Sequence, residues 1–296
     1  PCPRNGGHSD EGYSNLDGTL VIDVSKMIEI SVNEVEQTAT VDAGIRLGPL
    51  YIELARKNFT IVSGYSPTVG LSGIIAAGGF GMQSRKYGVT GDFVLEAQVV
   101  LANGSLVVAN SNTNSDLFWA LRGGGGAAYG IVTQWKLKLI PGWSSNILFT
   151  IDFNISTVSQ ILGKFSLWGH KSSENMSCTL WITKDTLKIS GHYLGDIALA
   201  HEILDEAKLS PNDDECVKMM ICDHLGSRAY FLDPDRTCKK INLLNIGTSP
   251  FGPNPFDPKT NTTIKVNSTG NFVTQDVLPD YSAGPVQERE LVKTKS

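Results

Sequence analysis

The sequence predicts an α+β fold built in two successive parts, and two observations lead to this prediction. In the first half, β-branched runs such as Val21–Val24 and Thr38–Val41 are typical of short strands, and stretches with helical spacing lie between such runs. From about Gly142 the sequence pattern changes: several strand-like runs follow one another and are then followed by a further amphipathic helix. A chain of 296 residues is long enough for one or two domains with a substantial core.

Several elements of the first half follow from periodicity and from turn residues. Leu47–Lys57 has its apolar residues at helical spacing, and residues 59–64 after it are predicted as a strand. Within Phe93–Ala109, two apolar runs flank Asn103 and Gly104, a favoured two-residue hairpin turn. This segment is therefore the clearest β-hairpin of the chain.

Two glycine clusters have little periodicity of their own. Ser66–Gly81 carries almost no charge, and an ordered loop of small residues suits a flat ligand that needs backbone N–H groups, although a surface loop or lid is the simpler alternative. The second cluster, LRGGGGAAYGIV at 121–132, follows a predicted helix over Asp116–Arg122 with Ser115 as its N-cap. A helix before the glycines and a strand after them is the reverse of a Rossmann loop, so that interpretation is rejected.

The second half is predicted to form its own α+β layer. Strand-like runs occupy residues 147–153, 179–184 and 187–195, and Ile197–Ala207 is an amphipathic helix. After Ser249 the chain is rich in Pro, Asn, Thr and Gly, which predicts a loop-rich tail.

Composition excludes several classes of function. Hydrophobic content of 41% and charged content of 19% fit a soluble globular protein. The net charge of −5 argues against nucleic acid or an anionic membrane as the main partner, and no apolar run has the length of a membrane span. There is no signal peptide, and Pro1 is not an initiator methionine, so we expect a mature or partial product.

Cysteines and glycosylation sequons indicate the compartment. Cys216, Cys222, His224 and Cys238 invite a zinc interpretation, but their spacing matches no common zinc frame, which favours disulfides or buried thiols. With an odd count, Cys2 is the natural unpaired residue. Six sequons, where chance gives about three, favour a secreted or secretory-pathway glycoprotein. They stand at Asn58, Asn103, Asn154, Asn175, Asn261 and Asn267.

Together, four segments resemble one known family. RNGGHS at 4–9, the glycine-rich stretch 66–81 with SRKYGVTGDFVLEAQVVLANG at 84–104, and DLFWALRGGGGAAYGIVT at 116–133 are similar to the FAD-linked oxidases of the vanillyl-alcohol oxidase (PCMH-type FAD-binding) superfamily, in its berberine-bridge-enzyme-like branch. The resemblance is dense from about Arg4 to Pro141. It implies a partial FAD-binding domain over 1–141, a substrate-domain-like region with an antiparallel sheet over 142–249, and the tail over 250–296.

The resemblance also implies the cofactor and its contacts. The histidine of the Gly-Gly-His motif is joined covalently to the flavin 8α position in the family, and here that residue is His8. Further FAD-binding residues would line the pyrophosphate or supply backbone contacts. They are Gly6, Gly7, Ser9, Thr68, Val69, Gly70, Gly73, Gly78, Gly79, Gly81, Gly130, Ile131 and Val132.

Departures from the family pattern refine this expectation. Ser66 stands where bicovalent members carry a cysteine, and Ile74 replaces the histidine that often accompanies it, so a single histidyl link is expected. Val69 matches a valine thought to leave oxygen access to the flavin. The family has further segments before the Gly-Gly-His motif and at its end, so the chain is expected to be incomplete at both ends, or completed by a second chain.

The expected function is that of an FAD-linked oxidase. A hydride would pass from an alcohol carbon of a sugar or secondary metabolite to covalently bound FAD, and O2 would reoxidise the flavin to give H2O2. The alternative is a non-enzymatic glycosylated binding or structural subunit that keeps the fold. No catalytic base is assigned, because His170, His192, His201 and His224 are more typical of surface or hydrogen-bonded histidines. Tyr193 is expected to pack in the core rather than face the flavin.

Overall fold

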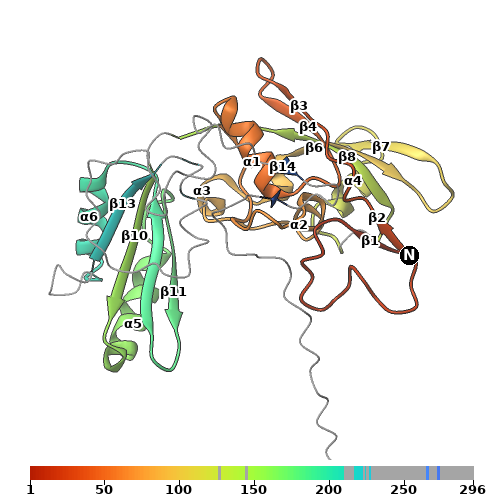
Figure 1. The fold of residues 1–296 in the computed structure, drawn as a ribbon. Coiled ribbons are helices and arrows are strands. Elements are labelled where there is room, and N and C mark those ends of the chain that lie inside the picture. Colours follow the sequence, from red (N-terminus) through yellow and green to blue (C-terminus); the bar gives the residue numbers. More distant parts are fainter. Residues whose placement is uncertain are drawn as a thin grey trace, which may run out of the picture.

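The computed structural model of the protein describes residues 1–125, 128–143, 146–209 and 217–222, with His224, Ser227, 265–266 and 272–273. Figure 1 shows two lobes lying side by side, one built around a five-stranded sheet and the other around a four-stranded sheet. The mixture of helices with antiparallel sheets confirms the α+β prediction. No helix in the described parts of the chain is long and apolar enough to cross a membrane.

The first lobe contains an antiparallel sheet with the strand order β3-β4-β8-β6-β7. Its strands are β3 (Ile30–Asn33), β4 (Thr38–Asp42), β8 (Ile131–Lys138), β6 (Val94–Val100) and β7 (Leu106–Asn110). Two short pairs accompany it, parallel β1 (Cys2–Arg4) with β2 (Val21–Asp23) and antiparallel β5 (Phe59–Thr60) with β9 (Ile140–Pro141). Its helices are α1 (Leu47–Arg56), α2 (Leu71–Ala76), α3 (Ser84–Tyr87), α4 (Ser115–Leu121) and the 3₁₀ turn Thr90–Phe93.

The core of the first lobe fixes where α2 lies. Leu50 and Leu54 of α1, Ile75 of α2 and Trp135 of β8 are almost completely buried in one cluster. The indole N–H of Trp135 donates to Ser72 Oγ over 2.9 Å, and the Ser72 hydroxyl donates to the Ala43 carbonyl over 2.6 Å. Because these bonds tie the start of α2 to the sheet, they also fix the loop that precedes α2.

The second lobe is a four-stranded antiparallel sheet with two helices against one face. Its strand order is β11 (Met176–Ile182), β12 (Leu187–Tyr193), β10 (Asn146–Phe153) and β13 (Val217–Cys222). The helices are α5 (Val158–Gly169) and α6 (Ile197–Glu206), and a 3₁₀ turn (Ile155–Thr157) precedes α5. Alternate residues such as Phe149, Ile189 and Tyr193 join Leu204 of α6 in a separate core. Tyr193 thus packs in the core, as expected from the sequence.

The two lobes meet along the segment from Met82 to Tyr87, which includes α3 (Figure 1). The buried ring of His192 on β12 lies with Nε2 3.0 Å from the Met82 carbonyl and Nδ1 3.4 Å from Gln83 Nε2. Arg85 donates to two carbonyls of the second lobe, those of Gly169 and Ser172. His192 is therefore a hydrogen-bonded histidine, as the sequence indicated.

Three helices, α2, α3 and α5, were not predicted from the sequence. Leu71–Ala76 falls inside the stretch expected to be an ordered glycine-rich loop, which is wrong for these six residues. The reason is that Leu71 and Ile75, four residues apart, are buried and stabilise a helix too short to show a period. Helix α5 (Val158–Gly169) was also missed.

Two details of the predicted turns are corrected. The hairpin loop has three residues, because Leu101 N bonds to the Ser105 carbonyl and only Gly104, at φ 82°, takes the left-handed conformation. A two-residue type I′ turn would need a positive φ at Asn103 as well. The N-cap of α4 is Asn114 rather than Ser115, and at φ 48° it uses the left-handed conformation that asparagine tolerates.

The structure describes only some of the residues on which the cysteine and tail predictions depend. Cys2 and Cys178 are free thiols, and burial raises the pKa of Cys178 to about 12. Cys216, Cys238 and the side chain of Cys222 lie outside the described residues, so a disulfide there stays a prediction. The loop-rich tail over 250–296 also lies outside them, apart from β14 (Lys265–Val266) and β15 (Phe272–Val273).

Gly44 tests the packing beneath the first sheet. A Cβ at this position would lie 1.9 Å from the Val24 carbonyl oxygen and 2.6 Å from that of Met27, so backbone would have to move. We expect Gly44→Ala to lower the free energy of unfolding by about 1–3 kcal/mol. Gly163→Ala on exposed helix α5, where a Cβ meets nothing within 4 Å, is the control and should raise it by about 0.5–1 kcal/mol. Urea unfolding measures both changes. Unfolding midpoints that shift in the same direction in the two variants would contradict this account.

Candidate functional site

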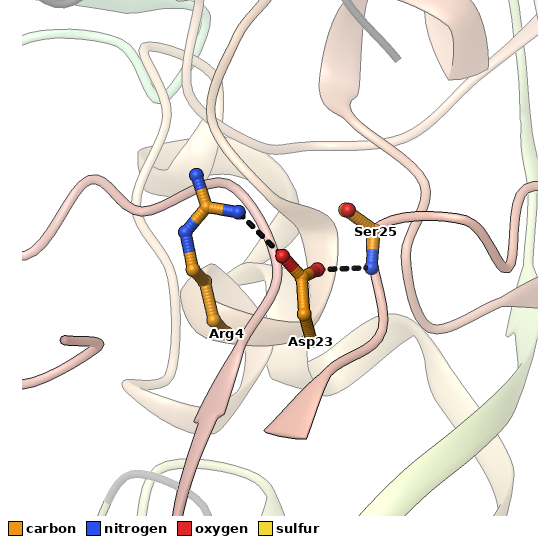
Figure 2. A network of polar contacts seen from close by, with 3 residues as sticks. All are labelled: Arg4, Asp23 and Ser25. Carbon is orange, nitrogen blue, oxygen red and sulfur yellow. Dashed lines mark hydrogen bonds and ion pairs between the residues drawn. The ribbon is translucent and has the colours of Figure 1, made fainter. Parts of the chain in front are cut away.

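The loop that follows β1 carries the Gly-Gly-His motif, and an ion pair fixes its base. Arg4, the last residue of β1, donates through Nη1 to Asp23 Oδ2 at 2.7 Å, and Asp23 Oδ1 accepts the Ser25 N–H at 2.8 Å (Figure 2). The Val24 N–H also bonds to the Arg4 carbonyl over 3.0 Å. Because both partners of Arg4 lie at the end of β2, the chain leaves β1 from a defined position.

The Gly-Gly-His loop packs backbone to backbone on the loop before α2. A Cβ on Gly6 would lie 2.3 Å from the Gly70 nitrogen, and one on Gly70 would lie 2.1 Å from Asn5 Oδ1. The same Asn5 oxygen accepts the Ser72 N–H over 3.2 Å. Glycine is therefore required at both contact points, because any side chain would separate the two loops.

His8 lies over the second loop, at Thr68. Its Nε2 is 2.8 Å from Thr68 Oγ1, which in turn is 3.4 Å from Ser66 Oγ. The His8 side chain is exposed by surface area, yet the protein atoms around its ring remove enough water to lower its pKa, and the positive charge of Arg46 lowers that pKa further. Asp10 acts in the opposite direction. The lowered pKa favours the uncharged imidazole, which has one nitrogen lone pair available.

The same loop offers an anion-binding surface. The backbone N–H groups of residues 6–9 donate to no acceptor among the described residues, and Gly7 takes φ 71°. Successive free N–H groups around a left-handed residue form a concavity that binds anions. Two arginines lie beside this surface. A Cβ on Gly7 would lie 3.4 Å from Arg4 Nε. Arg46 is close enough to Arg4 for the charge of Arg4, after burial, to lower the pKa of Arg46. These features suit a pyrophosphate.

The other predicted glycines meet at two further points. Gly78 and Gly79 have φ of 90° and 82°, and a Cβ on Gly79 would lie 2.3 Å from Thr90 Oγ1. A Cβ on Gly123 would lie 3.3 Å from Gly78 Cα, so the glycine clusters at 66–81 and 121–132 touch there. At Gly81 a Cβ would lie 2.2 Å from the Ser63 carbonyl oxygen. The three glycine clusters thus form one connected group of loops.

Not every predicted position opens toward a ligand. Gly73 does, because a Cβ there meets nothing within 4 Å. Gly130, by contrast, has φ 150° and would bring a Cβ to 2.7 Å from Val99 Cγ1 on β6. Ile131 and Val132 begin β8, and Val132 is buried in the first core. A packing role accounts for these last three residues, and a cofactor contact there stays a prediction.

The site contains polar residues that the sequence did not single out. Asn5 Nδ2, Thr90 Oγ1 and Arg122 Nε are buried and have no hydrogen-bond partner among the described residues. Thr90 lies against Gly79, and Asn5 lies against Gly70. Buried groups of this kind cost free energy unless a ligand or water satisfies them, so the donor set fits a large polar cofactor such as FAD. All three lie inside the segments that resemble the FAD-linked oxidases, although the sequence did not single them out individually.

The electrostatic link between Arg46 and His8 gives the next prediction. We expect Arg46→Gln to raise the pKa of His8 toward its ordinary value, because the variant removes the cation that disfavours the imidazolium. Proton NMR titration of the His8 ring resonances measures the shift. Arg56→Gln on the same helix is the control, since Arg56 pairs with Glu53 and should leave the His8 titration unchanged. An identical titration in both variants would contradict the assignment.

Known proteins share this arrangement. Residues 2–110 match the family model described as the FAD binding domain. The FAD-linked oxidoreductase pynB of Aspergillus niger is 40% identical over 194 residues, which cover 65% of this chain and 36% of that protein. Reticuline oxidase of Papaver somniferum is 34% identical over 218 residues, covering 69% of this chain and 40% of that protein.

Solved structures agree with the sequence relatives. Physcomitrella patens BBE-like 1 superposes with a TM-score of 0.74 at 32% identity, over 82% of this chain and 55% of that one. Chitooligosaccharide oxidase gives 0.73 at 28% identity, over 82% and 51%. The chain spans 36% and 40% of the length of the two curated relatives above. Residues 2–110 therefore match an FAD binding domain, and the chain is similar in sequence and fold to FAD-linked oxidoreductases and to berberine bridge enzyme-like proteins.

Proposed function

We propose that the protein oxidises an alcohol carbon of a sugar or secondary metabolite, passing a hydride to FAD that is bound covalently through His8. Dioxygen would then take the electrons from the flavin and form hydrogen peroxide. The observation that carries this proposal is the position of His8, which stands beside Thr68 at the end of a loop whose four N–H groups, at residues 6–9, have no acceptor among the described residues. The lowered pKa of His8 favours the neutral imidazole, which has a lone pair to act as a nucleophile, and the N–H groups would bind the pyrophosphate of the cofactor beside it.

A single covalent link follows from the neighbouring loop. Ser66, which stands where bicovalent members of the family carry a cysteine, has its hydroxyl 3.4 Å from Thr68 Oγ1. Of the two cysteines whose side chains are described, Cys2 lies at the start of β1 and Cys178 on β11. Neither belongs to the loop of residues 66–70, so the thioether link has no candidate there.

Buried polar side chains in the second lobe favour a polar substrate. On the sheet face opposite the helices, Thr150 and Ser190 are buried with their hydroxyls 3.4 Å apart. Asn146 on β10 is fully buried, and neither polar atom of its amide meets a hydrogen-bond partner in the described part of the chain. Polar groups on this face could orient a hydroxylated molecule. Among the similar proteins, one is named reticuline oxidase and another chitooligosaccharide oxidase, which supports a sugar or secondary metabolite as the substrate.

Oxygen as the electron acceptor is proposed from Val69. This residue matches the family position thought to leave oxygen access to the flavin, and here it packs against the edge of the first core beside His8's partner Thr68. Small-molecule substrate and O2 are thus the proposed partners. The catalytic base stays unassigned.

Acid precipitation tests the covalent cofactor. We expect the purified protein to be yellow and its acid-precipitated pellet to keep the flavin absorption, because a covalent bond survives denaturation. His8→Ala should lose all pellet-bound flavin while still binding FAD before denaturation, since the free N–H groups and the two arginines remain. A colourless wild-type protein would favour the non-enzymatic binding subunit. Flavin that stays in the His8→Ala pellet would sink the assignment of the link.

We further propose that the protein is secreted and glycosylated, and the structure ranks the sequons. Asn103 in the hairpin loop and Asn154 before α5 are exposed, so both accept a glycan without disturbing packing. Asn58 is exposed as well, at φ 58°. Asn175 is half-buried, and its Oδ1 accepts a hydrogen bond from Lys86 across the two lobes. Asn261 and Asn267 lie outside the described residues.

Glycan occupancy gives a separate test. In protein from a eukaryotic secretory host, we expect Asn103→Gln and Asn154→Gln each to remove one glycan, seen as a mass loss in intact-protein spectrometry. Asn175→Gln should remove less, because the Lys86 contact competes with glycan attachment at that side chain. An intact mass equal to that of the bare polypeptide would overturn the proposed glycosylation.

A further inference from the structure

We propose that the hydroxyl of Thr68, supported by that of Ser66, is a positioning group that holds His8 in the tautomer with its proton on Nε2, leaving Nδ1 to bond to the flavin. The inference rests on the proposed covalent attachment and adds what prepares the histidine for it. Thr68 was expected from the sequence to contact the cofactor through its backbone. Its side chain instead points to the histidine, because Oγ1 lies 2.8 Å from Nε2.

The segment that carries both hydroxyls is held rigidly. The Leu47 N–H bonds to the Val69 carbonyl over 2.9 Å, and the Gly48 N–H bonds to the Pro67 carbonyl over 3.0 Å. The Val69 N–H returns to the Ser66 carbonyl, which closes a turn around Thr68. Because this turn is tied to the start of α1, Thr68 Oγ1 occupies a defined place beside the His8 ring.

The His8 tautomer is tied to the direction of the hydrogen bond between Thr68 and Ser66. A threonine hydroxyl has one proton to donate and two lone pairs to accept with. Ser66 Oγ, at 3.4 Å, is the second partner of Thr68 Oγ1, and either hydroxyl can be the donor of that bond. The proposal assigns the donor role to Thr68, which turns the Thr68 lone pairs toward His8. Nε2 must then carry the hydrogen. Nδ1 has no protein partner among the described residues, so its lone pair is free.

The covalent step balances with this arrangement. The Nδ1 lone pair forms the bond to the 8α carbon, the 8α methyl loses one proton, and the imidazole loses the Nε2 proton through Thr68. Two electrons remain on the flavin, and dioxygen accepts them with the two protons to give hydrogen peroxide. The Thr68 hydroxyl thus accepts a hydrogen bond that strengthens as positive charge develops on the ring.

Attachment kinetics of the full chain provide the test. Protein produced without flavin is mixed with FAD, and the covalent fraction is followed by acid precipitation between about pH 5 and pH 9. We expect Thr68→Val to bind FAD but to attach it about three- to tenfold more slowly, the loss of one hydrogen bond. Thr68→Ser should restore the rate, and Ser66→Ala should lie between wild type and Thr68→Val. In Thr68→Val we expect the acid limb of the pH profile to shift, because the hydroxyl no longer stabilises one tautomer.

Two results would overturn the inference without touching the proposed function. One is a Thr68→Val protein that attaches FAD at the wild-type rate with the same pH profile while His8→Ala attaches none. The other needs no variant: ¹⁵N NMR of the wild-type chain that shows the His8 proton on Nδ1. If the wild-type protein attaches no flavin, the proposed covalent link itself is wrong, whichever tautomer NMR reports.

Discussion

The contact between the Gly6 and Gly70 backbones is the constraint on which the candidate site depends. It brings the start of the chain against a loop more than sixty residues away, and no side chain fits at either point. Once the two loops touch, Asn5 can bond to the Ser72 N–H and His8 can reach Thr68. The position of the histidine is thus set by the absence of two side chains.

A second set of interactions keeps that contact in place. The hydrogen bonds from Trp135 to Ser72 and from Ser72 to the Ala43 carbonyl join α2 to the central sheet. On the other side, Arg4 is held by Asp23. That ion pair is partly exposed and contributes little stability by itself, so its main effect is on geometry. The contact between the Gly-Gly-His loop and the loop before α2 is therefore fixed by a buried network on one side and a surface ion pair on the other.

Much of the architecture was predictable because it is local. Strands such as β4 and β6 and helix α1 show their period directly in the sequence, and the Gly-Gly-His motif identified His8. Helix α2 could not be predicted, because six residues with two buried apolar side chains show no period until the sheet covers them.

The roles of two further site residues were hidden for another reason. Arg46 gains its role only where α1 begins beside the Gly70 loop, and Thr90 only where Gly79 packs on it. Both depend on contacts between distant segments, which neither residue type nor spacing reveals.

The junction between the lobes is made largely with main-chain atoms. Arg85 binds the carbonyls of Gly169 and Ser172, and the Met82 carbonyl meets the His192 ring. Carbonyl oxygens are present whatever side chain a residue carries, so most positions of α5 and its following turn can change without loss of these bonds. Such a joint tolerates changes of sequence in the second lobe. The side chains of that lobe can be replaced while its main-chain contacts with the lobe that contains the FAD binding domain are kept.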